Sequence, residues 1–91
     1  MKYRIEHSKR FKKALKKLCL DDVKLVLHIV GKLANDEPLD SKYKDHKLKG
    51  NLEDFRECHI KPDLLLIYQK QEDILILTCI SVGSHSTLFK S

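Results

Sequence analysis

Five consecutive apolar residues, LLLIY at positions 64–68, constrain the fold of this chain more than any other feature. An uninterrupted run of this length is typical of a strand that is covered on both faces of a sheet. Residues 74–82 form a second, longer run that is rich in β-branched residues, and the polar residues 69–73 separate the two. The pattern predicts two antiparallel strands joined by a hairpin turn, with the first of them at the centre of the sheet.

Three shorter segments have the alternation of half-buried strands. Residues 2–7 alternate between apolar and charged side chains, and residues 46–50 form a short segment that ends at a glycine. In residues 55–60, Phe55, Glu57 and His59 share one face, and Arg56, Cys58 and Ile60 share the other. These segments extend the predicted sheet to four or five strands.

Two amphipathic helices are predicted between the first strand and the others. Ser8 is a suitable N-cap for a helix whose apolar residues recur at i, i+3, i+4 and i+7 from Phe11. After a break at residues 20–22, Asp21 or Asp22 is expected to cap a second helix that ends before Pro38. The order predicts one α+β domain over residues 1–91, a two-layer fold with an N-terminal strand, a two-helix hairpin and a 3–4-stranded antiparallel meander.

Positive charge is concentrated near the N-terminus. Residues 1–20 contain eight Lys or Arg residues against one Glu, whereas the net charge of the whole chain is +5. Four of the lysines lie on the predicted first helix: Lys12, Lys13, Lys16 and Lys17. Such a surface suits a polyanion or an acidic protein, although a solvated lysine-rich helix face has the same composition.

Cysteine usage and hydropathy suggest a cytoplasmic location. The three cysteines are odd in number and share no CxxC spacing, as expected for reduced thiols. No apolar run approaches the roughly 20 residues of a membrane span, and the N-terminus lacks an apolar signal core. We therefore expect a cytoplasmic protein without a membrane segment.

Three histidines lie at predicted strand ends, where catalytic side chains are often found: His46, His59 and His85. Asp45, Asp63, Arg56 and Lys61 lie near them in the sequence. Histidine can act as acid or base near neutral pH, so this set suits metal-independent cleavage of RNA through attack of a 2′-hydroxyl on the adjacent phosphate. Three histidines and a carboxylate can also bind zinc, but their spacing matches no zinc motif. We expect neither a metal nor another cofactor.

Three segments together resemble the YafQ branch of the RelE/ParE toxin superfamily: YKDHKLKG at 43–50, FRECHIKPDLLLIY at 55–68 and GSHSTLF at 83–89. The resemblance implies a RelE-like fold and the toxin of a type II toxin–antitoxin pair, a ribosome-dependent endoribonuclease that cleaves mRNA and inhibits translation. It implies acid–base roles for His46, His59 and His85, a supporting or base role for Asp63, and a positioning role for Phe89. Supporting roles fall on Asp45 and Arg56. Leu64 stands where the family can have Trp.

The resemblance also implies partners. These are a cognate antitoxin, the ribosome with its mRNA, and promoter DNA contacted mainly through the antitoxin. Six lysines are then candidates for binding ribosomal RNA or the antitoxin: Lys12, Lys13, Lys16, Lys17, Lys47 and Lys49.

Three alternatives stay open on the sequence. A non-enzymatic gyrase inhibitor of the ParE type has the same fold but does not need the histidines. A degenerate toxin would retain only binding of antitoxin or RNA, and a metal-dependent nuclease would require a divalent cation.

Overall fold

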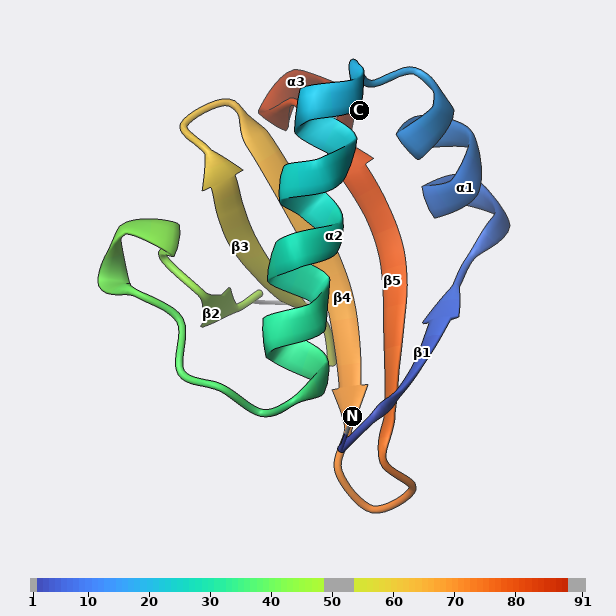
Figure 1. Ribbon diagram of the computed structural model, residues 1–91, viewed down its shortest axis with the longest axis vertical. Coiled ribbons are helices and arrows are strands. Elements are labelled where there is room, and N and C mark those ends of the chain that lie inside the picture. Colours follow the sequence, from blue (N-terminus) through green and yellow to red (C-terminus); the bar gives the residue numbers. More distant parts are fainter. Residues whose placement is uncertain (1, 49–53, 89–91) are drawn as a thin grey trace.

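The computed structural model describes residues 2–48 and 54–88 of the 91-residue chain. Five strands form one mixed sheet in the order β1-β5-β4-β3-β2 (Figure 1). They are β1 (Arg4–His7), β2 (His46–Lys47), β3 (Arg56–Lys61), β4 (Leu64–Gln71) and β5 (Ile76–Gly83). β1 runs parallel to β5, and the other pairings are antiparallel. The predicted α+β fold is therefore confirmed.

β4 is the middle strand, as the run at residues 64–68 predicts, and all five of those residues are buried. Leu66 and Tyr68 belong to the core cluster that includes Phe11 and Ile29 from the helices. Leu65 and Ile67 alternate with them and are buried outside that cluster, on the other face of the sheet. The sheet therefore has apolar side chains on both faces.

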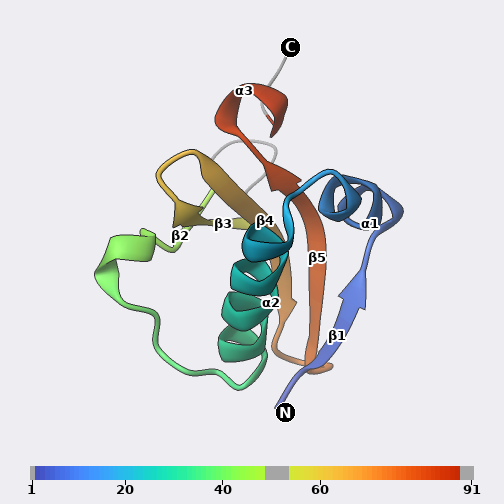
Figure 2. The same ribbon diagram turned by 45° about the horizontal axis from the view of Figure 1, so that its top comes forward.

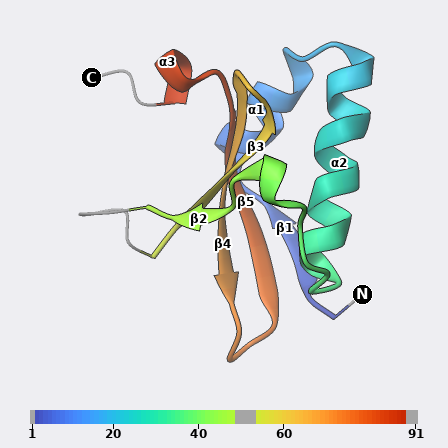
Figure 3. The ribbon, with the colours of Figure 1, turned by 90° about the vertical axis from the view of Figure 1, so that its left-hand side faces the viewer.

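Helices α1 (Lys9–Lys16) and α2 (Leu20–Ala34) contribute Phe11 and Ile29 to this core. Seen from the side, α2 lies along one face of the sheet, and the short helix α3 (His85–Leu88) lies on the other side (Figure 3). α1 lies near β1 and β5, whereas β2 and a 3₁₀ turn, η1 (Ser41–Tyr43), lie at the opposite edge (Figure 2). Ser8 caps α1 as predicted, because its Oγ accepts a hydrogen bond from the Phe11 amide at 3.0 Å.

Three local predictions were wrong. The helix break falls at residues 17–19, and the N-cap of α2 is Cys19, whereas Asp21 and Asp22 lie in the first helical turn. Acidic residues are favourable there as well, because they face the positive end of the helix dipole.

The other two errors concern the ends of β4 and β5. β4 continues to Gln71, so the turn comes later than expected, and β5 begins at Ile76. The residues after β5 form α3, whose first turn is capped by Ser84 through a hydrogen bond from the Thr87 amide at 3.2 Å.

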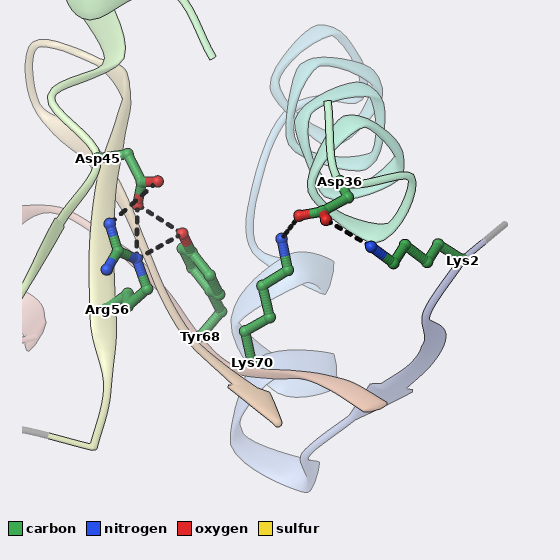
Figure 4. A network of polar contacts seen from close by, with 6 residues as sticks. All are labelled: Lys2, Asp36, Asp45, Arg56, Tyr68 and Lys70. Carbon is green, nitrogen blue, oxygen red and sulfur yellow. Dashed lines mark hydrogen bonds and ion pairs between the residues drawn. The ribbon is translucent and has the colours of Figure 1, made fainter. Parts of the chain in front are cut away.

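Asp36 joins three elements just after the end of α2. It adopts a left-handed backbone conformation with φ 60°. Its carboxylate accepts hydrogen bonds from Lys2 Nζ at 2.8 Å and from Lys70 Nζ, on β4, at 2.5 Å (Figure 4). These two ammonium groups lower the pKa of Asp36 to about 2. Over the described ranges, no helix has the length and apolar character needed to cross a membrane.

Candidate active site

His46, Glu57 and His59 form a cluster in which one carboxylate lies between two imidazoles. Glu57 Oε1 is 3.5 Å from His46 Nε2 and 3.5 Å from His59 Nε2. The ring centroids of the two histidines are 6.4 Å apart. The Glu57 side chain is only 7% exposed, whereas those of His46 and His59 are 49% and 24% exposed. The carboxylate is therefore buried beneath two imidazoles that solvent can reach.

Strand geometry explains this convergence. Glu57 and His59 are two residues apart on β3, so they point to the same face. His46 is the direct cross-strand partner of Glu57 in the pairing of β2 with β3. These are the positions at which side chains of neighbouring strands touch, which is why a two-residue β2 suffices to add the second histidine.

The backbone before β2 orients the ring of His46. Its Nδ1 donates a hydrogen bond to the Lys44 carbonyl oxygen at 2.6 Å. Lys44 has a left-handed conformation, φ 47° and ψ 44°, at the end of η1. Because a carbonyl oxygen only accepts, Nδ1 carries a proton and Nε2 is the nitrogen that faces Glu57.

Asp45, Arg56 and Tyr68 form a second cluster on the helix-covered face (Figure 4). Arg56 Nε donates to Asp45 Oδ1 at 3.3 Å and to Tyr68 Oη at 3.2 Å, and Arg56 Nη2 lies 3.3 Å from Asp45 Oδ2. Tyr68 Oη donates to Asp45 Oδ1 at 2.5 Å. Burial and the bond to Asp45 raise the pKa of Tyr68. Asp45 and Arg56, both predicted to support the site, are thus bonded to each other. Asp45 directly precedes His46 in the chain.

The remaining predicted site residues belong to other elements of the fold. Asp63 is exposed in the turn between β3 and β4. His85 is exposed at the start of α3. In the ladder, His59 is paired with Leu65, which is paired with Gly83, so two strand spacings of about 4.8 Å each separate His59 from the end of β5. Phe89 lies outside the described residues.

The predicted basic residues lie in two separate regions of the molecule. Lys12, Lys13 and Lys16 on α1 and Lys17 at its C-cap are all exposed, and α1 lies on the side of the molecule opposite β2 (Figure 1). Lys47 is exposed on β2, and Lys49 lies outside the described residues. Within the part of the chain that the structure describes, no group of three or more His, Cys, Asp or Glu side chains is arranged to hold a metal ion.

Glu57 is the residue that the sequence reasoning missed. The alternation of residues 55–60 placed it on the same face as His59, but it was not among the predicted site residues. Its signal was its position in mid-strand, where a charged side chain is buried only if it has partners. Cys58 is also buried, and burial raises the pKa of its thiol to about 12, so it is not a nucleophile at neutral pH.

Comparison with known proteins gives consistent matches. A family model described as the bacterial toxin YafQ of type II toxin–antitoxin systems matches residues 3–90. The mRNA interferase toxin YafQ of Escherichia coli K12 is 34% identical over 88 residues, which are 93% of this chain and 94% of that protein.

Two solved structures extend the match to three dimensions. A crystal structure of a metal-bound toxin from Helicobacter pylori is 54% identical, with a TM-score of 0.87 over 96% of this chain and 99% of that one. The E. coli DinJ–YafQ complex contains a chain that is 31% identical, with a TM-score of 0.84 over 96% of this chain and 98% of that one.

Proposed function

The chain belongs to the YafQ family of toxins from bacterial type II toxin–antitoxin systems, and on that premise we propose that it is an mRNA interferase, an endoribonuclease that inhibits translation. The observation that carries the proposal is the cluster of His46, Glu57 and His59. A buried carboxylate beneath two accessible imidazoles is an arrangement suited to acid–base chemistry.

The chemistry that we propose needs one base and one acid. A base removes the proton from a ribose 2′-hydroxyl, whose oxygen attacks the adjacent phosphorus. An acid protonates the 5′-oxygen as its bond to phosphorus breaks, leaving a 2′,3′-cyclic phosphate. His46 and His59, with ring centroids 6.4 Å apart, supply this pair, and Glu57 Oε1, 3.5 Å from Nε2 of each ring, stabilises whichever one becomes protonated.

His85 and Asp63 act from the edges of the same face in this proposal. His85 follows β5 and provides a further acid–base group. Asp63 supports the reaction from the turn between β3 and β4. Phe89 positions the substrate. Asp45 and Arg56 act indirectly, because their ion pair fixes the start of β2 and with it His46.

We further propose that cleavage takes place on the ribosome, in the cytoplasm. The exposed lysines of α1 lie away from the histidines, so they can contact ribosomal RNA phosphates while the site holds mRNA. Lys47 and Lys49 would contact RNA nearer to the site. By similarity to the toxin of the DinJ–YafQ complex, a cognate antitoxin binds this chain. Promoter DNA is contacted mainly through that antitoxin.

Expression of the toxin without antitoxin tests the function. We expect growth arrest with cleaved mRNA from the wild-type protein and neither effect from His59→Ala/His85→Ala. His28→Ala is the matched control, because His28 is exposed on α2. Full toxicity of the double variant would refute the proposal. DNA-damage signalling with intact mRNA would indicate a gyrase inhibitor of the ParE type.

A further inference from the structure

A pocket of about 520 Å³ lies beside the histidine pair. β2 pairs only with the first two residues of β3, so it leaves the edge of the later residues of β3 open to this pocket. Apolar side chains from α2, η1 and the end of β3 form much of its lining: Leu25, Tyr43, Ile60 and Pro62. A largely apolar pocket of this size with a few polar groups is typical of a binding site for a small molecule or a nucleotide.

The polar groups of this pocket are cationic. Lys42, Lys44 and Lys61 line it, and none of its described lining residues is acidic. Lys61 is engaged by Asp22 at 2.9 Å, which leaves Lys42 and Lys44 to meet an anion. Lys42 Nζ also lies 5.2 Å from the centroid of the Tyr43 ring. An aromatic ring can stack on a nucleotide base, and ammonium groups beside it can contact the phosphates of that nucleotide.

A larger pocket of about 720 Å³, near the end of α2, provides a contrast. Six carboxylate residues contribute to its lining: Asp36, Glu37, Asp45, Asp54, Glu72 and Asp73. Three cationic residues, Lys47, Arg56 and Lys70, also line it, so carboxylates outnumber cations there. The two pockets therefore differ in net charge, and the smaller one suits nucleic acid better.

His59 connects the smaller pocket to the active site. It lines that pocket, and its Nε2 lies 3.5 Å from Glu57 Oε1. We propose that the pocket is a base-binding subsite for RNA: it takes the base of a nucleotide next to the scissile phosphate, with Lys42 and Lys44 contacting flanking phosphates. This inference rests on the proposed function, because it assumes that the scissile phosphate lies at His59.

Two substitutions test the subsite and leave all the side chains of the histidine cluster in place. Tyr43→Ala removes the ring, and Tyr43→Phe retains it. Lys44→Gly removes the ammonium group but keeps the carbonyl that accepts from His46, and glycine readily adopts the left-handed conformation of residue 44. Lys24→Ala is the charge control, because Lys24 is exposed on α2 and lines neither pocket.

Binding is measured with a single-stranded RNA oligonucleotide that carries 2′-deoxyribose at the cleavage position, and cleavage is measured on ribosomes programmed with mRNAs that differ in the bases next to the cut. We expect Tyr43→Ala to weaken RNA binding by about tenfold or more, as for loss of one stacked base, and to change the preferred cleavage positions. Lys44→Gly should weaken binding and lower its salt dependence. Tyr43→Phe and Lys24→Ala should resemble the wild type.

Wild-type binding and an unchanged cleavage pattern in both Tyr43→Ala and Lys44→Gly would overturn the subsite. So would loss of antitoxin binding in these variants with RNA binding intact, because the pocket would then take an acidic protein segment. Failure of the proposed function itself gives a different result, in which His59→Ala/His85→Ala still cleaves mRNA. Thermal melting of each variant separates loss of binding from loss of the fold.

Discussion

His46 and Glu57 face each other directly across β2 and β3, with His46 Nε2 3.5 Å from Glu57 Oε1. The same carboxylate oxygen is 3.5 Å from His59 Nε2. One buried acidic side chain thus orients two histidines that belong to different strands. In the proposed reaction, this carboxylate lies where it can stabilise the imidazolium that forms when a ring takes up the proton of the 2′-hydroxyl.

Glu57→Gln should therefore reduce mRNA cleavage while preserving the fold. Glutamine keeps the size of the side chain and the ability to accept a hydrogen bond, but it removes the charge that stabilises an imidazolium. We expect the single-turnover cleavage rate to fall at least about tenfold, approaching the roughly 10²-fold or greater loss expected for His59→Ala. Glu72→Gln is the control, because Glu72 is exposed in the turn after β4. An unchanged rate in Glu57→Gln would show that the carboxylate has no part in the chemistry.

Tyr68→Phe should destabilise the protein. The Tyr68 hydroxyl donates to Asp45 and accepts from Arg56, and the residue is 1% exposed, so its removal leaves buried partners with fewer hydrogen bonds. We expect the free energy of unfolding in urea to fall by about 1–3 kcal/mol. Tyr43→Phe is the matched control, because Tyr43 is half-buried and no hydrogen bond joins its hydroxyl to a described residue. Equal stability of the two variants would contradict this account.

The sequence predicted those parts of the fold that depend on local pattern. Residues 64–68 identified the central strand because burial on both faces requires continuous apolar side chains. Alternation placed Glu57 and His59 on one face. The start of α2 was missed because aspartate is favourable both as a cap and in the first turn, so Asp21 and Asp22 fit two registers.

The site itself depends on contacts that local pattern does not encode. The register that pairs His46 with Glu57 joins strands separated by a long connection, and nothing in the sequence of residues 43–50 specifies it. The bond from His46 to the Lys44 carbonyl depends on a left-handed lysine, a conformation that is uncommon outside glycine, asparagine and aspartate. The parallel pairing of β1 with β5 likewise has no signal in the local sequence of either strand.

Asp36 should make stability depend on pH in the acid range. Lys2 and Lys70 lower its pKa to about 2 in the folded protein, below the value of about 3.9 for an unfolded aspartate. Its stabilising effect is therefore complete above about pH 4 and is lost as the pH falls towards 2. Melting temperatures at pH 5 and pH 2 should differ more for the wild type than for Asp36→Asn. In the control Asp73→Asn, the difference should match that of the wild type.

The three cysteines should differ sharply in reactivity. Cys58 and Cys79 are buried, and burial raises the pKa of each thiol to about 12, whereas Cys19 is exposed at the start of α2. Treatment of the folded protein with iodoacetamide at pH 8 should give one adduct, located at Cys19 by mass spectrometry. The unfolded protein in urea should give three. Rapid labelling of Cys58 without denaturant would contradict the described packing.

The pairing of β1 with β5 can form only late in the synthesis of the chain. Arg4 is paired with Ile76, and β5 joins β1 to the rest of the sheet. At roughly 5–20 residues per second, several seconds separate the synthesis of these two partners. His85 follows β5, so it emerges later still. A chain still under synthesis therefore lacks both the pairing of β1 with β5 and His85, the third histidine of the proposed site, and we expect it to be harmless to the ribosome that is making it.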